Sequence, residues 1–164
     1  MFTPSPVMNR RIAMTALLGA AVVAPQLTFA QSRGDLLMTA LMGGEFALQT
    51  SQLALRRSRN ARVRQFAQLE SNEQIAYAAA MGFRPGSADL NPDQQAMLQQ
   101  LSSVSGATFG RLYVRGQIAG HQELLALNQT FAQGASDPLR RAVATVAVPA
   151  IQTHLTMLSS MRTG

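Results

Sequence analysis

The stretch that decides the fold is residues 105–133, SGATFGRLYVRGQIAGHQELLALNQTFAQ. Its apolar residues recur every three or four positions, which gathers them on one face of an α-helix. Three more segments share this period, at about 35–57, 60–81 and 136–161, and a shorter helix is expected at about 92–103. No long stretch alternates between apolar and polar residues as a half-buried strand does. The sequence therefore predicts an all-α protein.

The lengths of the links between these helices indicate which of them pack side by side. Very few residues separate the first long segment from the second, or the third from the fourth, and helices joined so closely pack as antiparallel neighbours. The stretch 82–104 lies between the two pairs and contains the short helix, which Asn91-Pro92-Asp93 opens. Inside the first segment, Gly43-Gly44 permits a kink or a close helix contact. We expect an antiparallel four-helix bundle with a short extra helix between its second and third helices.

The N-terminal residues have the features of an export signal. Arg10 and Arg11 precede an apolar run at 12–24, and the small residue Ala30 fits cleavage before Gln31. The run is too short to span a bilayer, which needs about 20 apolar residues. The paired arginines are compatible with twin-arginine export, so the Sec and Tat routes both remain open.

The expected division of the chain is a signal peptide at 1–30 and one helical domain at 31–164. Translation from Met1 and translation from Met8 are both compatible with this division. We expect an exported protein of the periplasm or cell envelope, with no transmembrane helix in the mature chain.

Composition excludes several classes of site. The chain of 164 residues contains no Cys, which excludes disulfides, iron–sulfur clusters and thiolate zinc sites. Its formal net charge is +6, and every basic residue is Arg. No aromatic residue is interleaved with the one arginine cluster, so specific nucleic-acid binding is not expected. That cluster is either a solvated helix junction or a contact for an anionic surface. It consists of Arg56, Arg57, Arg59, Arg62 and Arg64.

Ionisable residues share the apolar faces of all four long helices. At 100° per residue, Glu45 lies on the apolar face of the first helix, and Glu70 and Glu73 lie on that of the second. His121 and His154 lie on the apolar faces of the third and fourth. Burial of a carboxylate or an imidazole is costly unless the group is paired. We therefore expect a polar cluster in the interior.

The heights of these residues along the helix axes indicate which of them can meet. Glu45 and Glu73 are at similar distances from the turn that joins their helices. His121 and His154 differ by about 7 Å in height, which argues against the two imidazoles meeting at one point. The hydroxyl of Tyr77, one helical turn after Glu73, is an expected hydrogen-bond partner for that carboxylate.

Two interpretations of the polar cluster remain open. Carboxylates and imidazoles from four helices are typical of di-iron bundles, but the Glu-x-x-His pairs of those bundles are absent here. The cluster is then either a hydrogen-bonded network without metal or a site for a single divalent metal ion. No catalytic triad, P-loop or dinucleotide fingerprint is present, so we assign no catalytic residue. The candidate metal ligands are Glu45, Glu70, Glu73, His121 and His154.

Five short motifs resemble one family in their order along the chain. The chain is similar to DUF4142, a family of exported bacterial proteins of unknown function that are thought to be ferritin-like. The resemblance implies a ferritin-like helical bundle in the periplasm or cell envelope, and it implies no established activity. The motifs are GGEF at 43–46, QFAQ at 65–68, LSSVSGATFGRLYV at 101–114, GHQE at 120–123 and IQTHL at 151–155.

The resemblance also bears on the site and on function. His121 and His154 match histidines of the family pattern, and Glu45 matches its first acid, but Glu73-Gln74 stands where the pattern has Asp-His. The lost imidazole disfavours a metal site in this member. We expect an exported bundle that is not an enzyme and that binds an unknown protein or small ligand, in a stress-related role by analogy with ferritin-like proteins. The alternative function is a metal-binding ferritin-like bundle with a single-ion site of inward Glu and His residues.

Overall fold

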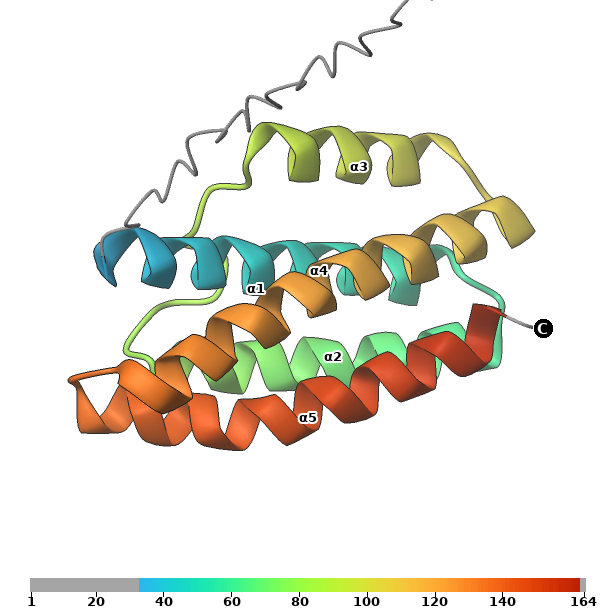
Figure 1. Cartoon of the computed structure of the whole chain (residues 1–164). Helices are drawn as coiled ribbons and strands as arrows, with labels where there is room; N and C mark the ends of the chain where they lie inside the picture. Colours follow the sequence, from blue (N-terminus) through green and yellow to red (C-terminus); the bar gives the residue numbers. More distant parts are fainter. Residues whose placement is uncertain (1–32, 163–164) are drawn as a thin grey trace, which may run out of the picture. The chain divides into compact units, whose positions relative to one another are not determined.

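The computed structural model describes residues 33–162, so the expected export signal at 1–30 lies outside the described residues. Within 33–162 the chain forms five α-helices and no strand, which confirms the all-α prediction (Figure 1). The helices are α1 (Arg33–Arg57), α2 (Ala61–Ala80), α3 (Pro92–Ser103), α4 (Gly106–Gly134) and α5 (Pro138–Arg162).

Local sequence signals account for the helix ends. The side-chain oxygen of Asn60 accepts hydrogen bonds from the backbone N–H groups of Arg62 and Val63, and this cap starts α2. Asn91 and Gln94 cap each other reciprocally at the start of α3. These bonds satisfy N–H groups that have no partner inside the helix. The observed helix limits therefore fall within two residues of those expected from the sequence.

The long helices pack in pairs. α1 lies along α2 and α4 lies along α5, while α1 also packs against α4 and α2 against α5. α3 lies over α1 and α4 (Figure 1). A Cβ atom on Gly43 would lie 2.9 Å from the Leu124 side chain, and one on Gly44 would lie 2.6 Å from Gln74. The two glycines therefore permit a close helix contact, one of the two roles expected for them.

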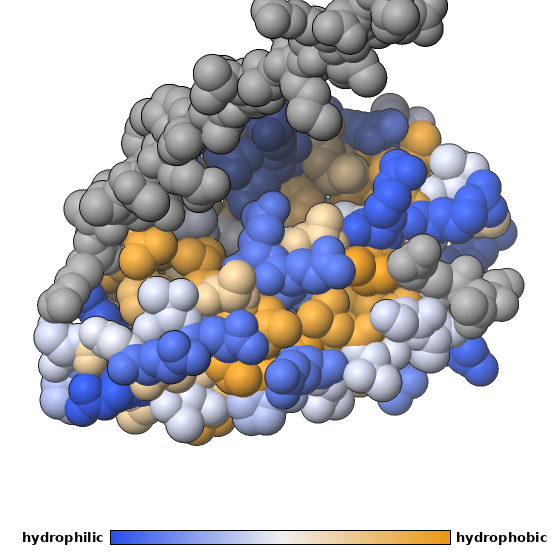
Figure 2. All heavy atoms as spheres, in the orientation of Figure 1, coloured by the Kyte–Doolittle hydropathy of each residue, from blue (hydrophilic) through white to orange (hydrophobic). Residues whose placement is uncertain are grey.

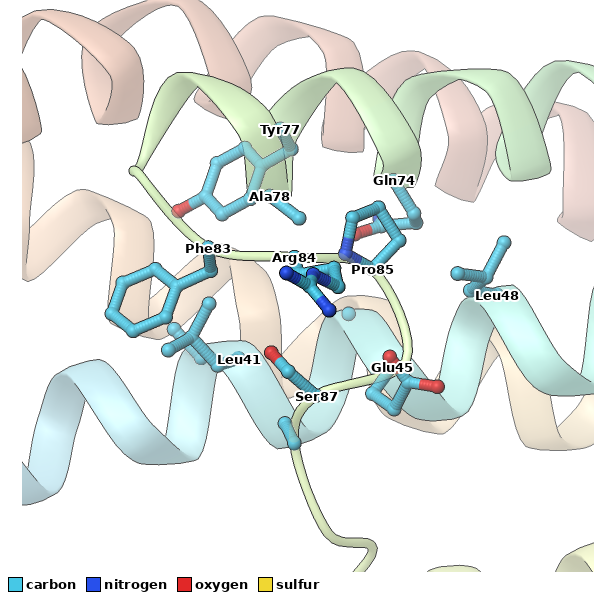
Figure 3. Close-up of a pocket in the computed structure, with 13 residues that line it drawn as sticks. Leu41, Glu45, Leu48, Gln74, Tyr77, Ala78, Phe83, Arg84, Pro85 and Ser87 are labelled. Carbon is cyan, nitrogen blue, oxygen red and sulfur yellow. The ribbon is translucent and has the colours of Figure 1, made fainter.

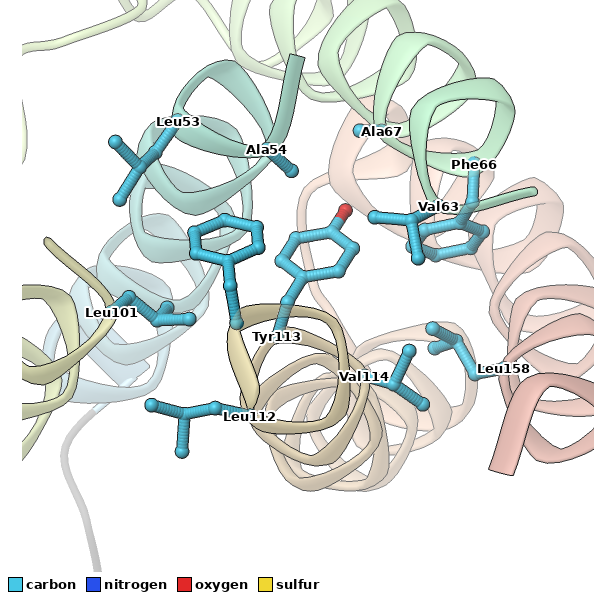
Figure 4. Close-up of a cluster of buried hydrophobic side chains, with 11 residues drawn as sticks. Leu53, Ala54, Val63, Phe66, Ala67, Leu101, Leu112, Tyr113, Val114 and Leu158 are labelled. Atoms are coloured by element: carbon cyan, nitrogen blue, oxygen red, sulfur yellow. The ribbon is translucent and has the colours of Figure 1, made fainter. Parts of the chain in front are cut away.

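The core has two apolar clusters. The larger one takes side chains from all five helices, among them Phe66, Leu101, Tyr113 and Leu158 (Figure 4). The smaller one contains Leu37, Leu41, Phe131 and Ala144. Along α4 and α5 the buried histidines lie between the residues of these two clusters. A polar layer thus separates two apolar parts of the interior.

One helix of the described part of the chain is long and apolar enough to cross a bilayer, judged by length and composition alone. This stretch is Pro138–Met161, nearly all of α5. A core helix of a soluble protein passes the same test, and α5 contributes Ala144, Ile151, His154 and Leu158 to the interior.

Candidate metal centre

Three buried side chains from three helices converge in the polar layer. His121 Nε2 of α4 lies 3.1 Å from Glu70 Oε2 of α2, and His154 Nδ1 of α5 lies 3.0 Å from the same oxygen. The two imidazole nitrogens lie 3.2 Å apart. Three ligand atoms thus form a nearly equilateral triangle.

The meeting of the two imidazoles corrects the expectation that they lie apart. His121 is 13 residues before the end of α4 at Gly134, and His154 is 16 residues after the start of α5 at Pro138. The offset is therefore about 4.5 Å along the helix axes. A helical side chain leans toward the N-terminus of its own helix. Because α4 and α5 run in opposite directions (Figure 1), the imidazoles lean toward each other and close this offset.

Each of the three side chains is also held by a second polar contact. His121 Nδ1 donates a hydrogen bond to the Gln117 carbonyl oxygen at 2.8 Å, since that oxygen can only accept. His154 Nε2 lies 3.1 Å from Glu73 Oε2. The Gln74 amide donates to Glu70 Oε1 at 2.8 Å. These contacts fix both rings and leave the three inner atoms facing one another.

The cluster is closed to solvent except on one side. The exposed fractions of Glu70, His121 and His154 are 0%, 1% and 4%. The Phe66 ring packs against both imidazoles, with centroid separations of 5.9 Å and 5.4 Å. The Glu73 side chain is 42% exposed and links His154 to solvent.

Opposing effects set the charge of the cluster. Burial acts to raise the pKa of Glu70, but hydrogen bonds and positive charge from the two histidines outweigh it and lower that pKa to about 2. Burial acts to lower the pKa of His154, but its contacts with Glu70 and Glu73 outweigh that effect and raise the pKa above its ordinary value. At pH values below the raised pKa of His154, the metal-free cluster therefore pairs the Glu70 carboxylate with a protonated His154 imidazole.

This pairing predicts a pH-dependent stability of the metal-free protein. The raised pKa of His154 contributes stability below about pH 6.5, and this is lost as pH rises through the folded value. The lowered pKa of Glu70 contributes stability above about pH 4.5, and this is lost as pH falls toward 2. Urea unfolding in EDTA should show stability falling above pH 6.5, by at most about 1.4 kcal/mol per pH unit. His154→Gln should flatten this fall, and an unchanged slope would contradict the assignment to His154.

The triangle has the dimensions of one face of a metal coordination sphere. Nitrogen and oxygen ligands lie about 2.0–2.2 Å from a transition metal ion, which puts ligands at right angles about 3 Å apart. The separations of 3.0–3.2 Å match this value. Two imidazoles and one carboxylate form the ligand set of a facial triad. Each of the three inner atoms can carry a lone pair, and lone pairs that face one another repel. A proton or a cation between the atoms removes this repulsion, and one divalent ion can bind all three atoms at once.

Glu45, the first of the candidate ligands, has other partners. It is buried, but its carboxylate accepts from the Gly86 N–H at 2.7 Å and from the Gln49 amide at 2.7 Å. Figure 3 shows it beside the segment that follows α2, near Pro85 and Ser87. The adjoining cavity of about 20 Å³ has room for little more than one water molecule. Glu45 thus fastens a turn to α1 and lies outside the Glu70–His121–His154 cluster.

Two further contacts differ from the sequence-based expectations. Tyr77 does not bond Glu73 but donates to Asn128 Oδ1 on α4 at 3.1 Å, so that prediction was wrong. Gln74 and the Gln117 carbonyl were not predicted as partners of the cluster, although each lies four residues from a cluster residue on its own helix, a spacing that could have indicated them. Glu73 lies at the edge of the cluster, in contact with His154 alone among the three.

Fold and site together define an all-helical protein with a buried Glu-His-His cluster that has the geometry of a metal site. The chain belongs to the DUF4142 family, a domain of unknown function, whose family model matches residues 18–161. This confirms the resemblance that the sequence motifs indicated. No curated protein and no solved structure matches the chain.

Proposed function

We propose that this protein binds one divalent transition metal ion in the core of its helical domain. The ligands are His121 Nε2, His154 Nδ1 and Glu70 Oε2. The observation that carries the proposal is the triangle of these three atoms, with sides of 3.0–3.2 Å, in a buried layer of the protein. A ligand set of two imidazoles and one carboxylate suits zinc, ferrous iron and their neighbours in the first transition row.

The outer contacts support metal binding over a purely structural network. Ligating histidines generally donate their second ring N–H to a carboxylate or a backbone carbonyl. His154 has Glu73 as such a partner, and His121 has the Gln117 carbonyl. A buried ion pair is by itself weak support for stability, because desolvation offsets most of its attraction. The cluster is therefore better explained by what it binds than by the stability it supplies.

The setting of the site is part of the proposal. We propose that the α1–α2 and α4–α5 pairs make an antiparallel four-helix bundle of the ferritin-like type, with α3 as the extra helix. The features of residues 1–30 support export, and we place the mature protein at 31–164 in the periplasm or cell envelope. The role is binding rather than catalysis, in metal handling or a stress response, by analogy with other helical bundles that hold ions.

Metal analysis tests the proposal. The purified protein is stripped with EDTA, dialysed against zinc, ferrous iron, manganese or copper, and assayed for bound metal by elemental analysis. We expect one ion per chain for the best-fitting metal. We also expect affinity to fall more than about 100-fold in His121→Ala and in Glu70→Gln, since even loss of an outer partner costs about 10–100-fold.

Glu45→Gln is the matched control, because Glu45 is a buried glutamate that lies outside the cluster. It should bind metal as the natural chain does. Glu73→Gln should show an intermediate loss, since Glu73 contacts only the outer nitrogen of His154. Substoichiometric binding of all four metals, or equal losses in Glu45→Gln and Glu70→Gln, would overturn the proposal.

A further inference from the structure

A cationic cleft lies at the end of the molecule where α1 meets α2 and α4 begins. Its volume is about 1050 Å³, and its lining comes from the link between α1 and α2, the first turns of α2 and α4, and the last turn of α5. Five arginines line it, and no Asp or Glu does. They are Arg57, Arg59, Arg62, Arg111 and Arg115.

Only part of this set belongs to the arginine cluster seen in the sequence. Arg56 and Arg64 do not line the cleft, whereas Arg111 and Arg115 of α4 do. All five lining arginines are exposed. None forms an ion pair with a carboxylate in the part of the chain that the structure describes. The guanidinium groups repel one another, and together they create a positive electrostatic potential in the cleft. This potential attracts anions.

The other lining groups add hydrogen-bond donors and apolar atoms. Ser105 is the N-cap of α4 but makes no side-chain capping bond, so the first N–H groups of α4 are free of that cap. The N-terminus of a helix favours negative charge. The lining also contains four apolar side chains, Val63, Val114, Ile118 and Met161. Figure 2 shows hydrophilic side chains over the N-terminal end of α4, next to hydrophobic ones.

We infer that this cleft binds a phosphate group, carried either by a small free anion or by a lipid headgroup. Phosphate offers several acceptor oxygens on a compact, multiply charged group, and the guanidinium fork of Arg matches it bidentately. Five arginines from α1, the α1–α2 link, α2 and α4 exceed what one carboxylate can use. Nucleic acid is disfavoured, because no aromatic side chain lines the cleft to stack on a base. The inference is independent of the metal site.

The test uses inorganic pyrophosphate in calorimetric titration, and vesicles of phosphatidylglycerol or phosphatidylcholine in cosedimentation, all at low salt. Arg62→Glu combined with Arg111→Glu changes one lining arginine of α2 and one of α4. We expect it to weaken pyrophosphate binding by at least about tenfold per arginine. Arg84→Glu combined with Arg141→Glu is the matched control, because it changes the net charge equally at exposed arginines outside the cleft. This control should bind within about twofold of the natural chain.

The two arms separate the sources of phosphate. Binding of pyrophosphate that depends on the cleft arginines identifies a free anion. Cleft-dependent binding of phosphatidylglycerol vesicles alone identifies a lipid headgroup, and either result supports the inference. Absence of binding in both arms would overturn it, as would equal losses in the two double variants. Tighter binding of a short single-stranded oligonucleotide than of pyrophosphate would also overturn it.

Discussion

Replacing both imidazoles, by His121→Leu and His154→Leu, is expected to lower the free energy of unfolding of the metal-free protein by about 3–5 kcal/mol. The double substitution leaves the Glu70 carboxylate buried, with the Gln74 amide as its remaining hydrogen-bond partner. A buried charge without a counter-charge is far more costly than the pair it came from. Urea unfolding followed by circular dichroism in EDTA near pH 6 measures the loss.

Adding Glu70→Leu to that double variant should restore most of the lost stability. The triple variant replaces the whole charged cluster by apolar side chains, an exchange that is often neutral or stabilising. Glu123→Leu is the matched control, because Glu123 is an exposed glutamate on α4, and it should restore nothing. If Glu70→Leu instead deepened the loss, Glu70 would be stabilised by groups other than the two histidines. A stable triple variant that binds no metal would show that the cluster is kept for binding.

Removal of the Phe66 ring is the second large effect. Phe66→Ala should destabilise the protein by about 3–5 kcal/mol, the range for a fully buried aromatic residue. Phe66 is 0% exposed and packs against Tyr113 as well as both imidazoles. The cavity left behind would lie directly beside the cluster. Thermal or urea unfolding of the purified variant measures the change.

Phe83→Ala is the control for this prediction, because Phe83 is only half-buried, in the segment after α2, and its loss should cost less. Phe66→Leu keeps most of the apolar volume and should recover much of the stability that Phe66→Ala loses. Equal losses for Phe66→Ala and Phe83→Ala would contradict the view that the Phe66 ring joins the larger apolar cluster to the Glu70–His121–His154 cluster.

Periodicity predicted the helices because each one buries a face, and a buried face repeats every three or four residues. The caps at Asn60 and Asn91 are equally local, since each bonds backbone groups within three residues of itself. The same reasoning placed Glu70, His121 and His154 on inward faces, and all three are buried. It also placed Glu45 inside, correctly, but gave no means of telling which inward residues touch one another.

The sequence by itself thus determined the helices, the family and the presence of ionisable groups in the interior. Only the tertiary structure decided that two imidazoles and the Glu70 carboxylate share one point, that Glu45 fastens a turn instead, and that Arg111 lines the same cleft as Arg62. The physical reason is that a helical period reports the direction of a side chain around its own axis. Contacts between helices depend on axial offsets of a few Å and on the lean of each side chain, which no single helix encodes.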